Sequence, residues 1–124
     1  MLNLRTIDCL EINFKMKVMQ WRDACQLAGL DILIVSTYRD NDYQNWLYAS
    51  GRTREGKICT NARGGESKHN TRQAIDFCIM DGKRCEWGDI AGFTKAGVIA
   101  ESIGLVWAGR WNGKIKEVGH IESH

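Results

Sequence analysis

With 124 residues, the chain is long enough to bury one hydrophobic core without disulfide support, so a single domain spanning residues 1–124 is expected. Its 44% hydrophobic and 26% charged residues are ordinary for a globular protein and exclude a disordered chain. The net charge of +2 is far below that of a nucleic-acid-binding surface, and no apolar run approaches the ~20 residues of a membrane-spanning helix, so we expect neither nucleic-acid binding nor membrane insertion.

The N-terminal region does not resemble an export signal, because Asp8 and Glu11 occur before a long apolar stretch can form. The five cysteines are an odd number without a Cys-x-x-Cys pair, which is typical of reduced thiols rather than of a disulfide framework. We therefore expect free thiols that mostly fill the core. We also expect the protein to stay in the cytoplasm in which it is made until another factor releases it.

Hydrophobic periodicity predicts the first two elements. From Phe14 to Ala28, apolar residues recur at three- to four-residue spacing, which predicts an amphipathic helix that ends at Gly29. The apolar, β-branched run at residues 31–37 then predicts a buried strand.

A second helix is predicted over residues 41–50, with Trp46 and Leu47 on its inner face. Residues 51–68 carry four glycines and many polar side chains, which indicates a long loop. Long loops within compact domains are often functional, so this segment is a candidate for part of a binding site.

The second half of the chain predicts three further strands and one helix. We expect a strand over residues 74–80, a turn at Asp81-Gly82, a helix over 90–103, and short strands over 105–111 and 118–122 that are separated by Asn112-Gly113. The order of elements is typical of an α+β domain in which helices pack on an antiparallel sheet.

Two of the three histidines, His69 and His120, lie in sequence contexts that suit a metal site. A catalytic zinc ion usually has three ligands from His, Asp or Glu and one open position for water. Asp76 is the candidate third ligand. It lies in an otherwise apolar strand, where an unpaired carboxylate is expensive to bury and a metal ion would offset that cost. The sequence therefore predicts a zinc site formed by these three residues.

Glu117 lies three residues before His120 and is the candidate general base. At this spacing its carboxylate can sit beside a metal-bound water without being a ligand, take a proton from it, and later give that proton to the leaving amine. The spacing alone leaves a second interpretation open, in which Glu117 is a solvated loop carboxylate and His120 is a surface residue.

Residues 67–76, Ser-Lys-His-Asn-Thr-Arg-Gln-Ala-Ile-Asp, resemble a known signature, Ser-x-His-x-x-Gly-x-Ala-x-Asp. It belongs to the zinc D-alanyl-D-alanine carboxypeptidases and L-alanyl-D-glutamate endopeptidases, which share a Hedgehog-like fold. Other segments resemble phage endolysins of this family, in the same order: Ser36–Arg39, Gln44, Leu47-Tyr48, 51–53, 60–62, 104–111 and 117–122. Together the segments cover about residues 30 to 122, which makes the resemblance specific.

The resemblance implies one catalytic zinc ion on His69, Asp76 and His120, with Glu117 as the acid and base. It also implies that Arg39 stabilises the developing oxyanion or holds a substrate carboxylate, a role that suits its fixed cationic fork.

Ser67, Gln44 and Trp107 are the candidate substrate-binding residues. Two of them have a plainer alternative. Ser67 precedes a turn, and a serine in that position often forms a hydrogen bond with the nearby backbone. Trp107 and Trp111 could belong to the core as readily as to a substrate groove.

Three positions depart from the family pattern. Arg72 replaces the glycine of the signature, Ile121 replaces the usual aromatic after the second histidine, and Glu117 stands where endolysin relatives often have aspartate. The first departure affects the loop between His69 and Asp76, because glycine adopts backbone angles that arginine adopts only at a cost.

The expected function is that of a zinc-dependent peptidoglycan endopeptidase of phage or prophage lysis type, which hydrolyses the L-alanyl-D-glutamate bond of the stem peptide. We expect a monomer without a separate wall-binding domain, which acts on the wall of the bacterial host after release from its cytoplasm. A D-alanyl-D-alanine carboxypeptidase or dipeptidase is the alternative within the same family. A second alternative is a Hedgehog-like module that binds zinc without catalysis, but such a module has no need of a base such as Glu117.

Overall fold

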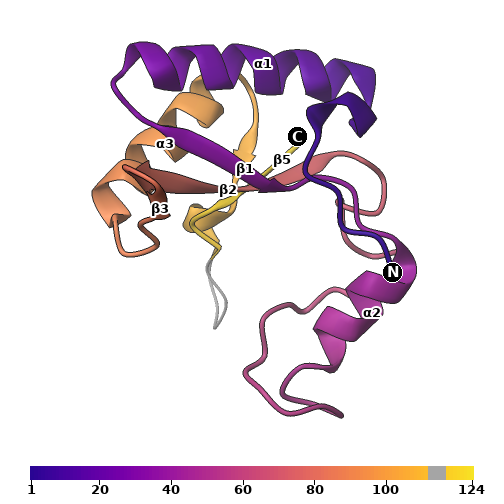
Figure 1. Ribbon diagram of the computed structural model, residues 1–124. Coiled ribbons are helices and arrows are strands. Elements are labelled where there is room, and N and C mark those ends of the chain that lie inside the picture. Colours follow the sequence, from indigo (N-terminus) through magenta and orange to yellow (C-terminus); the bar gives the residue numbers. More distant parts are fainter. Residues whose placement is uncertain (112–116) are drawn as a thin grey trace.

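A computed structural model describes residues 1–111 and 117–124 of the chain. The strands form an antiparallel sheet in the order β1-β2-β5-β4, and β3 pairs with the end of β2 (Figure 1). The predicted α+β class is confirmed. The regular elements are α1 (Ile12–Leu27), β1 (Ile32–Ser36), α2 (Asn41–Ala49), β2 (Ala74–Asp81), β3 (Arg84–Cys85), α3 (Ile90–Ser102), β4 (Val106–Trp107) and β5 (His120–Glu122), with 3-10 turns at Ile7–Cys9 and Ala108–Arg110.

Helices α1 and α3 pack on one face of the sheet. Phe77 of β2 contacts both of them, with ring centroids 4.9 Å from Trp21 of α1 and 5.5 Å from Phe93 of α3. The indole N–H of Trp21 also donates to the carbonyl of Ala96 at 2.9 Å, which joins the two helices. Because successive side chains of a strand point to opposite faces, Asp76 faces away from this core.

Strand β2 places Asp76 opposite residues of both neighbouring strands. The register pairs Asp76 with His120 of β5 and with Ser36 of β1. Directly opposed residues of antiparallel strands project from the same face. These three side chains therefore share the face of the sheet that α1 and α3 leave uncovered.

The prediction for α2 is correct for its extent and wrong for Trp46, whereas Leu47 is half-buried, as expected for the inner face. Gln44 is the buried residue of this helix, with 1% of its surface exposed, whereas Trp46 is 43% exposed. The guanidinium of Arg54 lies 3.8 Å from the centre of the Trp46 ring and shields it instead. Figure 1 shows the reason: α2 and the loop after it project away from the two helices of the core.

The expectation of free thiols is wrong for two cysteines. Cys78 of β2 and Cys85 of β3 form a disulfide, and their Cα atoms lie 5.7 Å apart. The hairpin turn explains the pairing, because it folds β3 back along the end of β2. Cys25 is a buried free cysteine in the core, as expected, whereas Cys59 is exposed.

The remaining elements agree with the predictions in part. The turn at Asp81-Gly82 is confirmed, because β2 and β3 pair across it. The strand predicted over 105–111 is much shorter, since a 3-10 turn replaces it after Trp107. The turn predicted at Asn112-Gly113 lies outside the described residues. Within the described residues, helices that combine the length and hydropathy needed to cross a bilayer are absent.

Arg72, at the glycine position of the signature, has a left-handed backbone with φ of 64°. For a residue with a Cβ atom this conformation costs about 1–2 kcal/mol. The arginine side chain offsets part of the cost: its guanidinium lies 4.1 Å from the centre of the Tyr38 ring and donates to the carbonyl of Cys9 at 3.1 Å. The loop between His69 and Asp76 thus has the left-handed conformation that the glycine of the signature would adopt, although arginine occupies the position.

Substitutions at Arg72 separate the cost of the left-handed backbone from the stabilisation by the side-chain contacts. Arg72→Ala is expected to lower the free energy of unfolding by about 1 kcal/mol, because alanine loses the side-chain contacts and keeps the backbone cost. Arg72→Gly loses the same contacts but removes the cost, so it should be more stable than Arg72→Ala by about 1 kcal/mol. Urea denaturation of the three proteins measures both differences. An alanine variant as stable as the glycine variant would contradict this account.

Candidate active site

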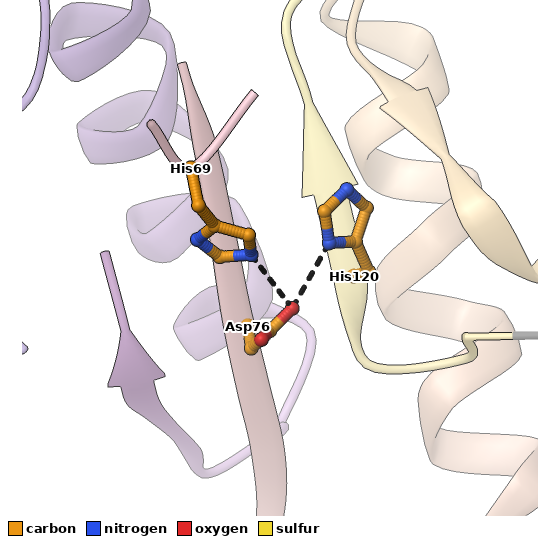
Figure 2. A group of neighbouring side chains, drawn as sticks. All are labelled: His69, Asp76 and His120. Carbon is orange, nitrogen blue, oxygen red and sulfur yellow. Dashed lines mark hydrogen bonds and ion pairs between the residues drawn. The ribbon is translucent and has the colours of Figure 1, made fainter. Parts of the chain in front are cut away.

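The three predicted metal ligands lie together on the open face of the sheet. The Nε2 atom of His69 is 3.3 Å from Oδ1 of Asp76, and Nδ1 of His120 is 3.0 Å from the same oxygen (Figure 2). One ligand atom from each residue lies within 4.8 Å of the others. The cross-strand register of β2 and β5 positions Asp76 and His120, and the turn before β2 brings His69 beside them.

Hydrogen bonds on the far side of each ring fix which nitrogen faces Asp76. His69 is 1% exposed, and its Nδ1–H donates to the carbonyl of Thr37 at 2.7 Å. The Nε2 atom of His120 donates to the carboxylate of Glu122 at 2.9 Å. Metal-binding histidines usually have such outer partners, because they set the tautomer and the orientation of the ring.

The donor set fits a divalent metal ion. Nε2 of His69 is buried, and it has no hydrogen-bond partner within residues 1–111 and 117–124. In a neutral ring that donates from Nδ1 to Thr37, Nε2 carries a lone pair, and this lone pair points at a carboxylate oxygen. Such an arrangement is repulsive unless a positive charge lies nearby. Two imidazole nitrogens and one carboxylate are the ligand set of a catalytic zinc site.

The electrostatics of the site also favour a cation. Burial alone raises the pKa of Asp76, but His69, His120 and Arg39 outweigh burial and hold that pKa well below its ordinary value. Burial likewise lowers the pKa of His120, but hydrogen bonds to Asp76 and Glu122 outweigh it and raise the pKa to about 9. The site therefore holds a negative charge that attracts either a proton or a metal ion.

Glu117 lies beside the three residues. One oxygen of its carboxylate is 3.5 Å from Nδ1 of His120, and 29% of the side chain is exposed. Burial raises the pKa of Glu117 above its ordinary value. A carboxyl group with a raised pKa exchanges protons more readily near neutral pH, which suits a general acid and base.

Arg39 is held from three directions. Its Nη2 pairs with Oδ2 of Asp76, its Nε donates to the hydroxyl of Ser36 at 3.2 Å, and its Nη1 donates to the amide oxygen of Gln44 at 3.4 Å. The amide nitrogen of Gln44 donates in turn to the carbonyl of Ala62 at 2.9 Å. The burial and contacts of Gln44 suit a residue that orients Arg39 and the long loop, and its predicted contact with substrate stays a prediction.

The other two candidate substrate residues have structural roles in this geometry. The hydroxyl of Ser67 accepts from the backbone N–H of His69 at 3.2 Å, which is the turn contact considered as the alternative. Trp107 is 5% exposed, and its indole N–H donates to the carbonyl of Val118 at 2.8 Å. The alternative that Trp107 belongs to the core therefore fits its position, and a substrate contact by either residue is untested.

A cavity of about 370 Å³ lies against the site. Four of the charged or ligating residues line it, together with apolar side chains. Trp87 is 55% exposed and is held in place by stacking on the ring of Phe93, with 6.0 Å between centroids. Residues that line the cavity include Arg39, Asp76, Glu117, His120, Leu47 and Trp87.

Sequence patterns do not predict the roles of Thr37, Glu122 and Trp87. Thr37 contributes only a backbone carbonyl, which no side-chain motif reveals. Glu122 lies two residues after His120 on β5, and residues at this spacing on a strand lie on the same face. This spacing was the one signal in the sequence for the position of Glu122. Trp87 follows the β2–β3 hairpin, and only the fold brings it to the cavity.

Comparison with known proteins agrees with the geometry. The sequence matches the VanY family, described as D-alanyl-D-alanine carboxypeptidase, over residues 8–121. It is 34% identical to the peptidoglycan L-alanyl-D-glutamate endopeptidase CwlK of Bacillus subtilis, over 85% of this chain and 70% of that protein. It is 26% identical to the L-alanyl-D-glutamate peptidase of Listeria phage A118, over 90% of this chain and 37% of that protein.

Solved structures share the fold. The L-Ala D-Glu endopeptidase ChiX of Serratia marcescens superposes with a TM-score of 0.71 at 13% identity, over 95% of this chain and 83% of that chain. The D,D-pentapeptidase VanY of a VanB-type vancomycin resistance cassette, solved in complex with Zn(II), gives 0.68 at 15% identity, over 92% and 72%. At these identities the likeness concerns the fold alone. The family match covers nearly the whole chain, and the chain therefore belongs to the VanY family of peptidases.

Proposed function

We propose that this peptidase hydrolyses the L-alanyl-D-glutamate bond of the peptidoglycan stem peptide with the help of one zinc ion. The observation that carries the proposal is the grouping of His69, Asp76 and His120 at the edge of one cavity. Asp76 and His120 line this cavity together with Glu117 and Arg39. The name of the 34% identical relative from Bacillus subtilis, a peptidoglycan L-alanyl-D-glutamate endopeptidase, supports the choice of bond.

His69, Asp76 and His120 would hold the zinc ion through Nε2, a carboxylate oxygen and Nδ1. When bound, zinc lowers the pKa of a water ligand and so supplies a nucleophile near neutral pH. Thr37 and Glu122 keep the two imidazoles in the tautomers that direct lone pairs at the metal position.

Glu117 and Arg39 perform the remaining steps. Glu117 takes the proton of the attacking water and returns it to the leaving amine, a transfer that its position beside His120 and its raised pKa allow. The guanidinium of Arg39 faces the cavity beside Asp76 and stabilises the negative charge that develops on the carbonyl oxygen, or holds a carboxylate of the substrate. The second of these roles suits a substrate that contains D-glutamate.

The family description supports a D-alanyl-D-alanine carboxypeptidase as the second candidate, because the same metal site serves both reactions. The similarity to a Listeria phage peptidase supports a role in phage or prophage lysis. A non-catalytic zinc module fits less well, since Glu117 lines the cavity beside the metal position as a base would.

Digestion of purified peptidoglycan, followed by mass spectrometry of the products, distinguishes these functions. New N-terminal D-glutamate that depends on added zinc is the expected result. Release of D-alanine instead would establish the second candidate. The absence of any zinc-dependent product, from a folded protein that binds zinc, would establish the non-catalytic module.

Two variants separate metal binding from proton transfer. His69→Ala should lose both zinc binding and activity, because it removes a buried ligand. Glu117→Gln should keep zinc but lower kcat by roughly 10²- to 10⁴-fold, because it removes the acid and base. Zinc affinity is measured by competition with a chromogenic chelator. Asp23→Asn, an exposed carboxylate on α1, is the matched control and should retain both properties. Full turnover by Glu117→Gln would refute the role of Glu117.

Trp87 is expected to bind the substrate rather than to act in the chemistry. Trp87→Ala should raise KM by roughly tenfold with little change in kcat, because it removes an aromatic wall that contacts ground state and transition state alike. Trp87→Phe should retain most of the affinity. Trp46→Ala, an exposed tryptophan outside the cavity lining, serves as the control. Steady-state kinetics with a stem-peptide substrate give both constants, and an unchanged KM for Trp87→Ala would exclude the contact.

A further inference from the structure

The N-terminal segment runs alongside the stretch that carries Arg39. Backbone hydrogen bonds join Leu4 to Thr37 and to Tyr38, and Leu2 to Asp40, with N···O distances of 2.6 to 3.1 Å. A further β-bridge pairs Asn3 with Arg39, and Figure 1 shows the N-terminus beside the start of α2. The match to the VanY family begins at residue 8, so this segment lies outside the part of the chain that defines the family.

Asn3 contacts Arg39 through one intermediate side chain. The hydroxyl of Ser36 donates to the amide oxygen of Asn3 at 2.5 Å, and the same hydroxyl accepts from Nε–H of Arg39 at 3.2 Å. Ser36 is 3% exposed, whereas Asn3 is exposed at the surface. A hydroxyl has a single proton, and its donation to Asn3 leaves a lone pair free to accept from the guanidinium. Asn3 therefore fixes the direction of this hydroxyl.

The contact with Ser36 matters because of what else holds Arg39. The partner at Nη2 is Asp76, which is also a proposed metal ligand, so its carboxylate is shared between the guanidinium and the metal position. Among the described residues, Ser36 and Gln44 are the other two hydrogen-bond partners of the guanidinium, and neither belongs to the metal site. Of these two, the contact at Ser36 is the shorter.

We propose that Asn3 is a positioning residue of this enzyme, which acts through the hydroxyl of Ser36 to hold the Arg39 guanidinium in its orientation toward the cavity. The inference rests on the proposed function, in which Arg39 contacts the substrate. A guanidinium that is oriented in advance stabilises developing charge without having to reorganise during the reaction. We call the chain of hydrogen bonds from Asn3 through Ser36 to Arg39 the relay. The backbone pairing of the segment does not need the Asn3 side chain, so a substitution of Asn3 tests the relay by itself.

Asn3→Ala is expected to lower kcat/KM roughly threefold to tenfold, mainly through kcat, because it removes one hydrogen bond that orients a group used in the transition state. Asn3→Asp should retain most of the activity, since a carboxylate oxygen accepts a hydrogen bond from the Ser36 hydroxyl equally well. Asn13→Ala changes an exposed asparagine on α1 and is the matched control. An unaffected Asn3→Ala enzyme, or an Asn3→Asp enzyme as impaired as Asn3→Ala, overturns the proposal.

A double-mutant cycle distinguishes positioning from a general structural effect. In an Arg39→Ala background, Asn3→Ala should cause no further loss of activity, because the relay then has nothing to orient. A structural role would give the same fractional loss with and without Arg39, and that result would overturn the proposal. Thermal unfolding of all variants confirms that the comparison is made between folded proteins.

A third measurement does not require peptidase activity. The Nε–H of Arg39 gives a ¹H–¹⁵N signal that is identified by its loss in Arg39→Ala, and Asn3→Ala should shift this signal and speed its exchange with water. Asn3→Asp should leave the exchange slow. If the wild type fails to cleave peptidoglycan, the proposed function fails while this signal still tests the relay. If Asn3→Ala leaves the Arg39 signal and its exchange rate unchanged, the relay is refuted, and this result does not depend on which bond the enzyme cleaves.

Discussion

Two imidazole nitrogens directed at one carboxylate oxygen are the interaction on which the rest of the site depends. Nε2 of His69 and Nδ1 of His120 lie 3.3 and 3.0 Å from Oδ1 of Asp76, in a position where the far side of each ring already donates a hydrogen bond. In neutral rings this arrangement directs electron pairs at a carboxylate oxygen, and a proton or a metal ion at that position relieves the repulsion. The antiparallel register that sets Asp76 opposite His120 is therefore the feature of the fold that makes the chemistry available.

The residues around His69, Asp76 and His120 form two groups with different roles. Thr37 and Glu122 hold the imidazoles, and Lys68 supports Glu122 with an Nζ that lies 3.4 Å from its carboxylate. On the cavity side lie Glu117 and Arg39, for which we propose proton transfer and the stabilisation of negative charge. Under the proposed function, the cavity wall rather than the ligand set would select the bond that is cut.

The grouping of His69, Asp76 and His120 was predictable from the sequence because it concerns side chains: an acidic residue within an apolar strand and two histidines are visible without a structure. The register of the sheet could not be read in the same way, so neither Thr37, which contributes a carbonyl, nor Trp87, which arrives from a hairpin, was predictable. The burial of Gln44 in place of Trp46 was missed because the contact with Arg54, eight residues away in the long loop, overrides hydrophobic periodicity. The disulfide between Cys78 and Cys85 was missed because it depends on the hairpin geometry.

The central claim is that the two imidazoles and Asp76 bind one metal ion together. Anomalous X-ray diffraction from zinc-loaded crystals, collected on both sides of the zinc absorption edge, tests it most directly. The account predicts a single strong peak within about 2.0–2.2 Å of Nε2 of His69, Nδ1 of His120 and a carboxylate oxygen of Asp76. A fully loaded protein whose zinc peak lies elsewhere, or contacts only one of these three side chains, would contradict it.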